Sequence, residues 1–305
     1  MLQPLMIMVA FLPNDASIYS TQVLSTLSVT ALIGIGTWGT LFSSSATAQM
    51  DLIPDATLTP SGNLADQNST LNLAATVKGS AGILIEGGAT RSGNLFHSFQ
   101  EFNVQAGQRV YFANPLGIDN ILTRVTGSDV SDIFGTLGVD GAANLFLLNP
   151  NGFVFEESAQ LDISGSFVST TAESIDFGNG QIFGAPAPQN APLLTVNTPI
   201  GLQYGRSAAD IRVEGSGSLA FFDFNTSLTD RSLRPTGLEV LEGSTLALLG
   251  GRLTVSGGNL TSAGGNIELA AIRAGYLPLK DGTAGYLPLI FKTTYHRLIC
   301  PQGRP

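Results

Sequence analysis

The sequence has little charge and almost no cysteine. Charged residues make up 12% of its 305 positions, roughly half of the usual share, and Lys and Glu are too scarce for coiled coils or helical repeats. The single cysteine, Cys300, excludes a disulfide within the chain. A formal net charge of −9 argues against nucleic acid as the main partner, because phosphates would be repelled. Intrinsic disorder is also excluded, since hydrophobic residues make up 43% of the chain.

The N-terminal region lacks basic residues altogether. Residues 1–77 contain no Lys or Arg, yet the apolar run 23–42 is followed by the small residues 46–48, which match an A-x-A cleavage site. We therefore expect residues 1–48 to be a signal peptide cleaved after Ala48, although the usual basic start is missing. An uncleaved membrane anchor is the alternative, because a run of this length could span a bilayer.

Glycine, in contrast, is abundant, with 36 residues in the chain. Short runs of alternating apolar residues end at glycine pairs, most clearly over residues 238–269. Such alternation places the apolar side chains on one face of a strand. The corners recur roughly every seven residues, which is more often than the strands of a sandwich or barrel require. We therefore predict an all-β fold, a parallel β-helix, in which residues 51–77 form an N-terminal cap.

The central part of the sequence contains four ordered blocks of a known pattern. They are LFHSF with FNV (residues 95–104), NILTRVTG (120–127), ANLFLLNPNG (143–152) and GSFV with TTA (165–172). In order and spacing these blocks resemble the filamentous haemagglutinin N-terminal domain, also called the two-partner secretion or haemagglutination activity domain, particularly in its cyanobacterial members. The resemblance is close over residues 55–200 and loose over residues 200–275.

This resemblance implies a fold and a task. The implied fold is a right-handed parallel β-helix with an N-terminal cap and short extra-helical strands, here over residues 49–275. The implied task is the secretion of a large adhesin- or haemagglutinin-like exoprotein. The domain would cross the periplasm and be recognised by an outer-membrane β-barrel transporter with periplasmic substrate-binding repeats. The expected location is the cell surface or the medium, and host cells or glycans are further candidate partners.

The sequence Asn149-Pro150-Asn151-Gly152 is typical of a tight turn. Pro150 fixes φ at the second position, Asn151 is tolerated at the third, and Gly152 suits the fourth. The turn would join a strand over residues 144–148 to the strand that follows it. We interpret it as a transporter-recognition or folding turn, and the alternative is a turn with only a geometric role.

Asn120 and Arg124 are candidates for a partner contact. Both belong to one strand-like run, and Arg124 is one of only 14 basic residues in the chain. The alternative is that Arg124 forms a salt bridge or points outward into solvent. The acidic residues considered for that salt bridge are Asp119, Asp129 and Asp132.

The sequence shows no convincing catalytic or metal site. Glu156 and Glu157 are adjacent, so their side chains would diverge in a strand, and the two histidines, His97 and His296, are far apart in the sequence. No phosphate-binding loop or dinucleotide fingerprint is present. We therefore expect a protein that is not an enzyme and uses no cofactor or metal. The alternative functions are an autonomous surface adhesin or structural β-solenoid that binds glycan or cells and, less favoured, a carbohydrate-active β-helix.

The C-terminal region changes in character. The motif GYLPL at residues 275–279 recurs at residues 285–289, and the glycine-stopped alternation then disappears. We expect residues 276–305 to be an irregular tail produced by truncation or a frame shift of a longer exoprotein. A natural disordered tail is the alternative. We also expect the last coil, near residue 270, to be poorly capped and prone to aggregation.

Overall fold

The computed structural model divides the chain into two units, Met1–Thr47 and Ala48–Pro305. All described residues belong to the second unit: 52–58, 67–178, 180–186, 199–217, 221–223, 228–230, 235 and 237–279. The expected signal peptide and residues 280–305 lie outside them. The described part of the chain contains strands and turns but no helix, so no helix there could cross a membrane.

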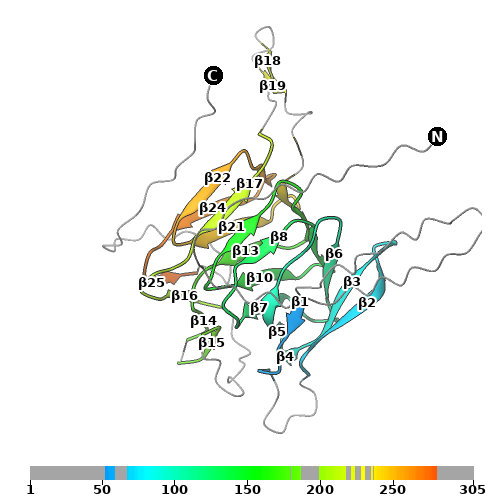
Figure 1. Ribbon diagram of the computed structural model, residues 1–305, viewed down its shortest axis with the longest axis vertical. Helices are drawn as coiled ribbons and strands as arrows, with labels where there is room; N and C mark the ends of the chain where they lie inside the picture. The colour runs from blue at the N-terminus through cyan, green and yellow to red at the C-terminus, as the bar shows by residue number, and fades with distance from the viewer. Residues whose placement is uncertain are drawn as a thin grey trace, which may run out of the picture. The chain divides into compact units, whose positions relative to one another are not determined.

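Three stacks of parallel strands form the body of the fold (Figure 1). Sheet A contains β5 (Asn94–Phe102), β7 (Asn120–Val125), β10 (Asn144–Leu148), β13 (Phe167–Thr170), β21 (Thr245–Gly250) and β24 (Asn266–Ala271). Sheet B contains β3 (Ser80–Gly87), β6 (Arg109–Ala113), β9 (Thr136–Asp140) and β12 (Gln160–Asp162). Sheet C contains β8 (Ser131–Ile133), β11 (Phe153–Phe155), β17 (Ile211–Glu214) and β22 (Leu253–Ser256). A parallel pair, β20 (Leu238–Val240) and β23 (Leu260–Ser262), lies beyond β12.

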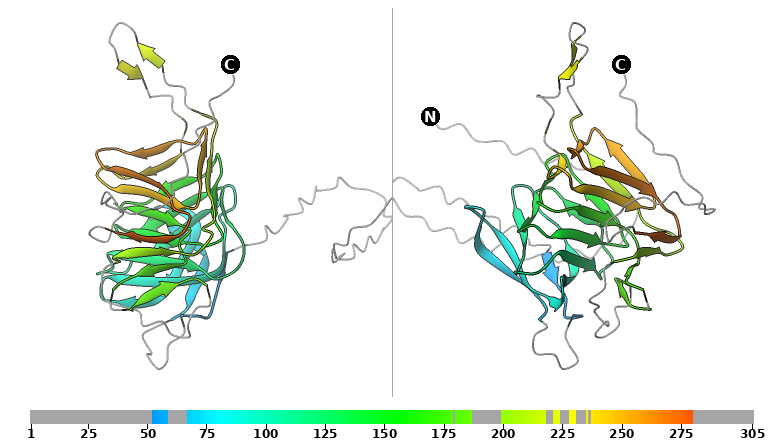
Figure 2. Two further views of the ribbon diagram at one scale, coloured as in Figure 1. Left: turned by 90° about the vertical axis from the view of Figure 1, so that its left-hand side faces the viewer. Right: turned by 180° about the vertical axis from the view of Figure 1, so that it is seen from behind.

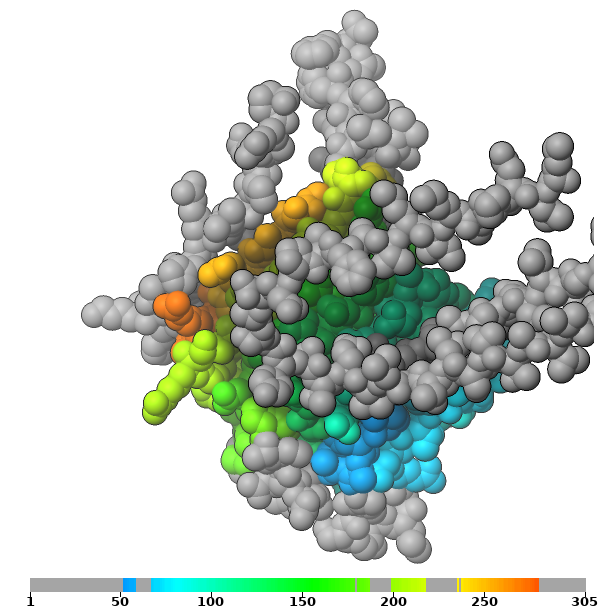
Figure 3. All heavy atoms as spheres, in the orientation of Figure 1, coloured from blue at the N-terminus to red at the C-terminus, as the bar shows by residue number. Residues whose placement is uncertain are grey.

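The chain visits these stacks in a repeating order. The coil β7–β8–β9 passes through sheets A, C and B, and the next coil, β10–β11–β12, follows the same path one layer further on. Each strand pairs in parallel with its equivalent in the neighbouring coil. Figure 2 (left) shows the strands stacked from cyan to orange, and Figure 3 shows successive bands in the same order. This arrangement is a parallel β-helix, which confirms the fold predicted from the glycine-stopped alternation.

The core of the β-helix is a set of in-register rows. Because parallel strands pair one coil above the next, equivalent side chains lie over one another. One inward row shows a maximum exposure of 2%: Leu95, Ile121, Leu145, Phe167 and Leu246. These residues supply the continuous apolar interior that the alternation predicts.

The outer face of sheet A is buried as well. Its row of outward residues is fully buried: Phe96, Leu122, Phe146, Val168 and Ala247. They pack in one cluster with side chains of an extra-helical antiparallel sheet, sheet D, formed by β14 (Ser174–Asp176), β15 (Ile182–Gly184), β16 (Gly201–Tyr204) and β25 (Gly275–Pro278). Burial on both faces explains why the strands of sheet A read as nearly continuous apolar runs.

The N-terminal cap expected over residues 51–77 is present in the described residues. Strand β1 (Leu52–Pro54) pairs antiparallel with β5, and β2 (Ser69–Val77) pairs antiparallel with β3. A short strand, β4 (Ala89–Arg91), also runs antiparallel to β5. Further along the chain, β18 (Phe221–Asp223) and β19 (Leu228–Asp230) form an extra-helical hairpin. The cap and the extra-helical strands are therefore both confirmed.

The end of the stack differs from the expectation in one respect. The irregular tail was expected from residue 276, but β25 continues to Pro278 and pairs with β16. These residues therefore belong to the folded domain, because sheet D needs them as an edge strand. Among the described residues, no strand pairs with the far side of β24, where Ile267 is 42% exposed.

Candidate transporter-recognition turn and neighbouring polar clusters

The turn at residues 149–152 joins β10 to β11 at the corner between sheets A and C. The N–H of Gly152 donates to the carbonyl of Asn149 at 3.1 Å, which closes a four-residue turn. Gly152 has a φ of +115°, and a Cβ atom there would approach the carbonyl oxygen of Asp210 to 2.7 Å. The sequence therefore needs glycine at this position for both reasons.

The side chain of Asn149 is fully buried and fastens this corner. Its Nδ2 donates to the carbonyl of Asp129 and to Oγ of Ser131, each at 2.9 Å, and both acceptors belong to the preceding coil. Its Oδ1 accepts from the backbone N–H of Asn151 at 2.9 Å and from Nδ2 of Asn151 at 3.0 Å. The amide group of Asn149 is thus engaged at both ends inside the fold.

Asn151 strengthens the same attachment and is half-buried with Pro150. Its Nδ2 also donates to the carbonyl of Gly127, at 2.8 Å, in the preceding coil. The turn is therefore tied to its neighbour by both asparagines, which supports the folding interpretation. Recognition by a transporter stays a prediction, and Pro150 and part of Asn151 are the surface that a partner could reach in the folded domain.

Asn120 belongs to a ladder of asparagines at the N-terminal ends of successive strands of sheet A. Its Nδ2 donates to Oδ1 of Asn94 at 3.1 Å, and its Oδ1 accepts from Nδ2 of Asn144 at 3.0 Å. Oδ1 of Asn144 in turn accepts from the backbone N–H of Ser166 at 2.8 Å. The ladder links four successive coils. A partner contact through Asn120 stays a prediction.

Arg124 is buried, with 1% exposure, on the outer side of sheet A. Its guanidinium donates from Nε to Oγ of Ser98 (3.0 Å), from Nη1 to the carbonyl of Gly184 (2.7 Å) and from Nη2 to Oγ1 of Thr57 (2.9 Å). It also lies 4.6 Å from the ring centroid of Phe183. Burial lowers the pKa of Arg124 to about 10, and the charge of Asp55 opposes that shift.

The alternatives considered for Arg124 are wrong. The side chain is not solvated, and among the described residues its hydrogen bonds go to none of Asp119, Asp129 and Asp132. Asp119 and Asp129 lie in loops, and Asp132 lies in β8. The partners of Arg124 are instead Ser98 in β5 and two residues about 60 positions away in either direction, Thr57 and Gly184. The folded domain leaves the guanidinium almost no surface for direct contact, so a partner role stays a prediction.

Asp55 is the centre of another group of hydrogen bonds, which the sequence analysis did not identify. Its Oδ1 accepts from the N–H (2.9 Å) and Oγ1 (2.6 Å) of Thr57. Its Oδ2 accepts from Oγ of Ser98 (2.8 Å) and Oγ1 of Thr126 (2.5 Å). Burial alone would raise the pKa of Asp55, but these hydrogen bonds outweigh it and lower the pKa below its ordinary value.

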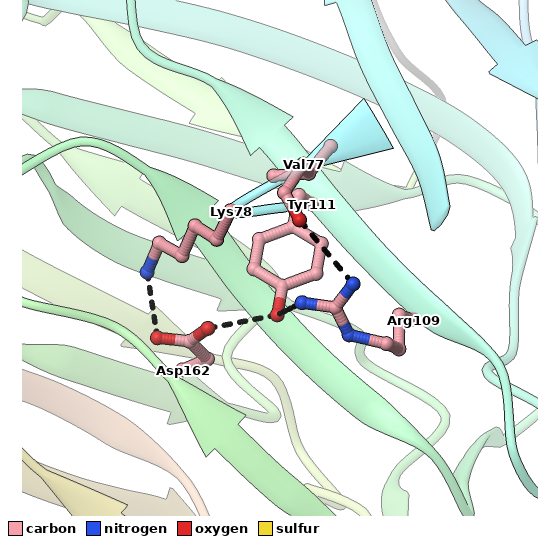
Figure 4. A network of polar contacts seen from close by, with 5 residues as sticks. All are labelled: Val77, Lys78, Arg109, Tyr111 and Asp162. Carbon is pink, nitrogen blue, oxygen red and sulfur yellow. Dashed lines mark hydrogen bonds and ion pairs between the residues drawn. The ribbon is translucent and has the colours of Figure 1, made fainter. Parts of the chain in front are cut away.

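A separate polar cluster lies on the outer face of sheet B (Figure 4). Nζ of Lys78 pairs with Oδ1 of Asp162 at 2.6 Å, and the hydroxyl of Tyr111 donates to Oδ2 of Asp162 at 2.8 Å. Nη2 of Arg109 donates to the same hydroxyl at 2.7 Å. Gly138 makes room for the tyrosine, because a Cβ atom there would lie 2.3 Å from its ring. Burial and Asp162 raise the pKa of Tyr111 to about 12. The cluster holds the tip of the β2–β3 hairpin against the coils.

Metal-binding chemistry has no candidate in the described part of the chain. No group of three or more His, Cys, Asp or Glu side chains there could hold a metal ion. The polar clusters described above consist of groups that bond to one another and to the backbone. Their geometry supports a structural role at corners and flanks of the β-helix.

Comparison with known proteins gives a family. The model of the family described as "TPS secretion domain" matches residues 56–287. No curated protein matches the chain. A solved structure titled "Crystal structure of filamentous hemagglutinin secretion domain" is similar at 15% identity with a TM-score of 0.33, covering 72% of this chain and 99% of that one. That likeness is too low to support an argument, whereas the family match spans well over half of the chain. The chain therefore belongs to the TPS secretion domain family, a family of substrates of two-partner secretion and not of enzymes.

Proposed function

We propose that this domain directs a large adhesin- or haemagglutinin-like exoprotein to a dedicated outer-membrane β-barrel transporter with periplasmic substrate-binding repeats. The chain would reach that transporter through the periplasm after export by its N-terminal signal. The family match over residues 56–287 carries this proposal. The β-helix with its cap and extra-helical sheet supports it, because the polar clusters found in the described residues bond to one another and to the backbone and so serve the fold.

The burial of the candidate contact residues supports a proposal about the state in which the chain is recognised. Asn149 and Arg124 have exposures of 0% and 1% in the folded domain, and Asn120 is engaged in a ladder. A transporter could contact the side chains of Asn149 and Arg124 directly only before the β-helix forms, whereas Asn120 is half-buried. We therefore propose that the transporter binds the chain while it is unfolded, and that the turn at residues 149–152 then helps to lock the exported chain in its folded form.

The release of the full chain into the medium tests the proposal. The chain is expressed in a bacterial host with and without a candidate transporter, and the fraction in the medium is measured. Transporter-dependent release is the expected result. Release that is equal without the transporter, or retention in both cases, would contradict the proposal and favour an autonomous surface adhesin or structural β-solenoid.

A matched pair of variants separates recognition from folding. Asn114, like Asn149, precedes a proline and fixes a corner, because its Oδ1 accepts from the N–H groups of Ala142 (2.9 Å) and Ala143 (3.0 Å). If the transporter reads the turn at residues 149–152, Asn149→Ala reduces release much more than Asn114→Ala at an equal loss of folding stability. Equal reductions would show that only folding matters at this turn.

A further inference from the structure

Residues 52–58 form a strap, here called the N-terminal strap, that runs from the edge of β5 onto the outer face of sheet A. Strand β1 pairs antiparallel with the end of β5, with Leu52 opposite Phe102. The chain then turns at Asp55, whose carboxylate accepts hydrogen bonds from within the strap and from β5. Leu58, at the other end, is 2% exposed and belongs to the hydrophobic cluster on the outer face of sheet A.

A second segment covers the same face. Strands β14 and β15 form an antiparallel pair, and Phe183 of β15 packs edge-on against Phe96 of β5, with ring centroids 5.0 Å apart. Phe177, which follows β14, lies 5.9 Å from the same ring. The strap and this β14–β15 pair are far apart in the sequence but share one apolar cluster.

Arg124 joins the two segments. One guanidinium nitrogen, Nη2, donates to Thr57 of the strap, and the other, Nη1, donates to the carbonyl of Gly184 in β15. The ring of Phe183 lies against the guanidinium. When only one segment is in place, the charged group faces water on its other side. When the second segment closes, it removes that water and supplies the missing acceptor. The acceptor matters because a buried guanidinium donor without a hydrogen-bond partner costs folding free energy.

We propose that Arg124 couples the closing of the N-terminal strap to the docking of β15. Each segment completes the surroundings that the other needs, so the two close together more firmly than either does alone. The strap, although it is among the first residues of the domain to be made, therefore locks only after the chain has been delivered through residue 184. The coupling is a property of the fold, and it holds whether or not the transporter proposal is correct.

Hydrogen exchange on the full chain, read by mass spectrometry, tests this coupling. Phe183→Leu removes the aromatic face from Arg124 and keeps most of the apolar volume. We expect at least a tenfold faster exchange of the strap amides, including the N–H of Asp55 that donates to the carbonyl of Ser98. The reciprocal variant, Thr57→Val, removes the acceptor for Nη2 at nearly constant volume and is expected to speed exchange in β14 and β15.

Two controls keep the test specific. Ile182→Ala changes a residue of β15 that is 52% exposed, and it should leave exchange in the strap unchanged. Phe153→Ala weakens the inner core of the β-helix, a cluster separate from the one that contains Phe183, and it reports the effect of a general loss of stability. The proposal is overturned if Phe183→Leu leaves strap exchange unaltered, or if it speeds exchange equally in the strap, β10 and β11.

Discussion

Burial differs between the two ends of the β-helix. The coils nearer the N-terminal cap, which contain β7, β10 and β13, are called the lower coils here, and the opposite end, at β22, β23 and β24, is called the upper end. In β10, the residues from Leu145 to Leu148 are all fully buried, whereas β24 has two exposed and four half-buried residues. Both strands belong to sheet A, but β10 is a nearly continuous apolar run, whereas the apolar residues of β24 alternate with Asn266 and Glu268. The difference shows that burial in this fold is determined by neighbouring coils and by sheet D, and only partly by the alternation within a strand.

The corners differ in the same way. Lower corners are fastened by asparagine side chains, such as Asn149 and Asn120, which bond to neighbouring coils. Upper corners contain glycine pairs that approach the backbone of the neighbouring coil. A Cβ atom at Gly251 would lie 2.0 Å from the carbonyl oxygen of Ala208, and one at Gly265 would lie 2.0 Å from that of Ser244. Close backbone approach at glycine also occurs in the lower coils, at Gly127 against Gln100 and at Gly135 against Gln108. The lower corners are therefore distinguished by their additional asparagine hydrogen bonds.

The largest difference is expected for core truncations. Phe146→Ala removes a fully buried ring from the outer face of sheet A and should lower the free energy of unfolding by about 3–5 kcal/mol. Leu269→Ala, in half-buried β24, should cost about 1–2 kcal/mol, because less surface is buried there. Urea unfolding of both variants measures the values. Equal losses would mean that the upper end is as tightly packed as the lower coils.

A smaller difference is expected between the corners. Asn149→Ala leaves the buried Oγ of Ser131 and the carbonyl of Asp129 without their donor, and should cost about 1–3 kcal/mol. Ser262→Ala removes one upper-corner bond, from Oγ to the carbonyl of Ser244, and should cost about 1 kcal/mol. Thermal or urea unfolding compares the two, and a larger loss for Ser262→Ala would reverse the order proposed here.

The lower coils should also respond to acid. His97 is fully buried, and burial lowers its pKa to about 3. In the unfolded chain the pKa of this histidine is about 6.5, so it takes up a proton at a higher pH than in the folded chain. The free energy of unfolding therefore has its full value above pH 6.5 and falls as the pH drops toward 3, by about 2 kcal/mol at pH 5. His97→Gln should flatten this part of the pH profile of unfolding. An unchanged slope between pH 6.5 and 5 in that variant would exclude His97 as the cause.

The smallest expected effect is a gain. Among the described residues, Oγ1 of Thr123 is buried without a hydrogen-bond partner. Thr123→Val removes this group at nearly constant volume and should raise the free energy of unfolding by about 1 kcal/mol. Thr170→Val is the matched control, because Oγ1 of Thr170 bonds to the hydroxyl of Tyr204 at 2.9 Å and its loss should destabilise. A loss of stability in Thr123→Val would contradict this description of the interior.

Much of the lower region could be predicted from the sequence. The strand expected over residues 144–148 has the bounds of β10, and the turn after it forms as its residue types require. Short alternating runs that end at glycine were sufficient to predict a β-helix, since the alternation and the corners are local properties of the chain.

The polar clusters could not be predicted in the same way. The partners of Arg124 come from the N-terminal strap and from β15, which meet only when the extra-helical sheet packs on sheet A. The contact of Tyr111 with Asp162 likewise depends on three successive strands of sheet B being in register, because Gly138 lies between the two residues. Contacts between residues so far apart in the sequence leave no signal in a short sequence pattern. The nearly continuous apolar run in β10 was a signal that both faces of sheet A are buried.

Hydrogen exchange along the whole stack is the most direct test of the contrast between the lower and upper coils. The full chain is exchanged under native conditions, and the protection of β7, β10 and β13 is compared with that of β22, β23 and β24. We predict that the lower strands exchange only by global unfolding, while the upper strands exchange at least tenfold faster through local opening. Equal protection in all six strands would contradict the graded stability proposed here.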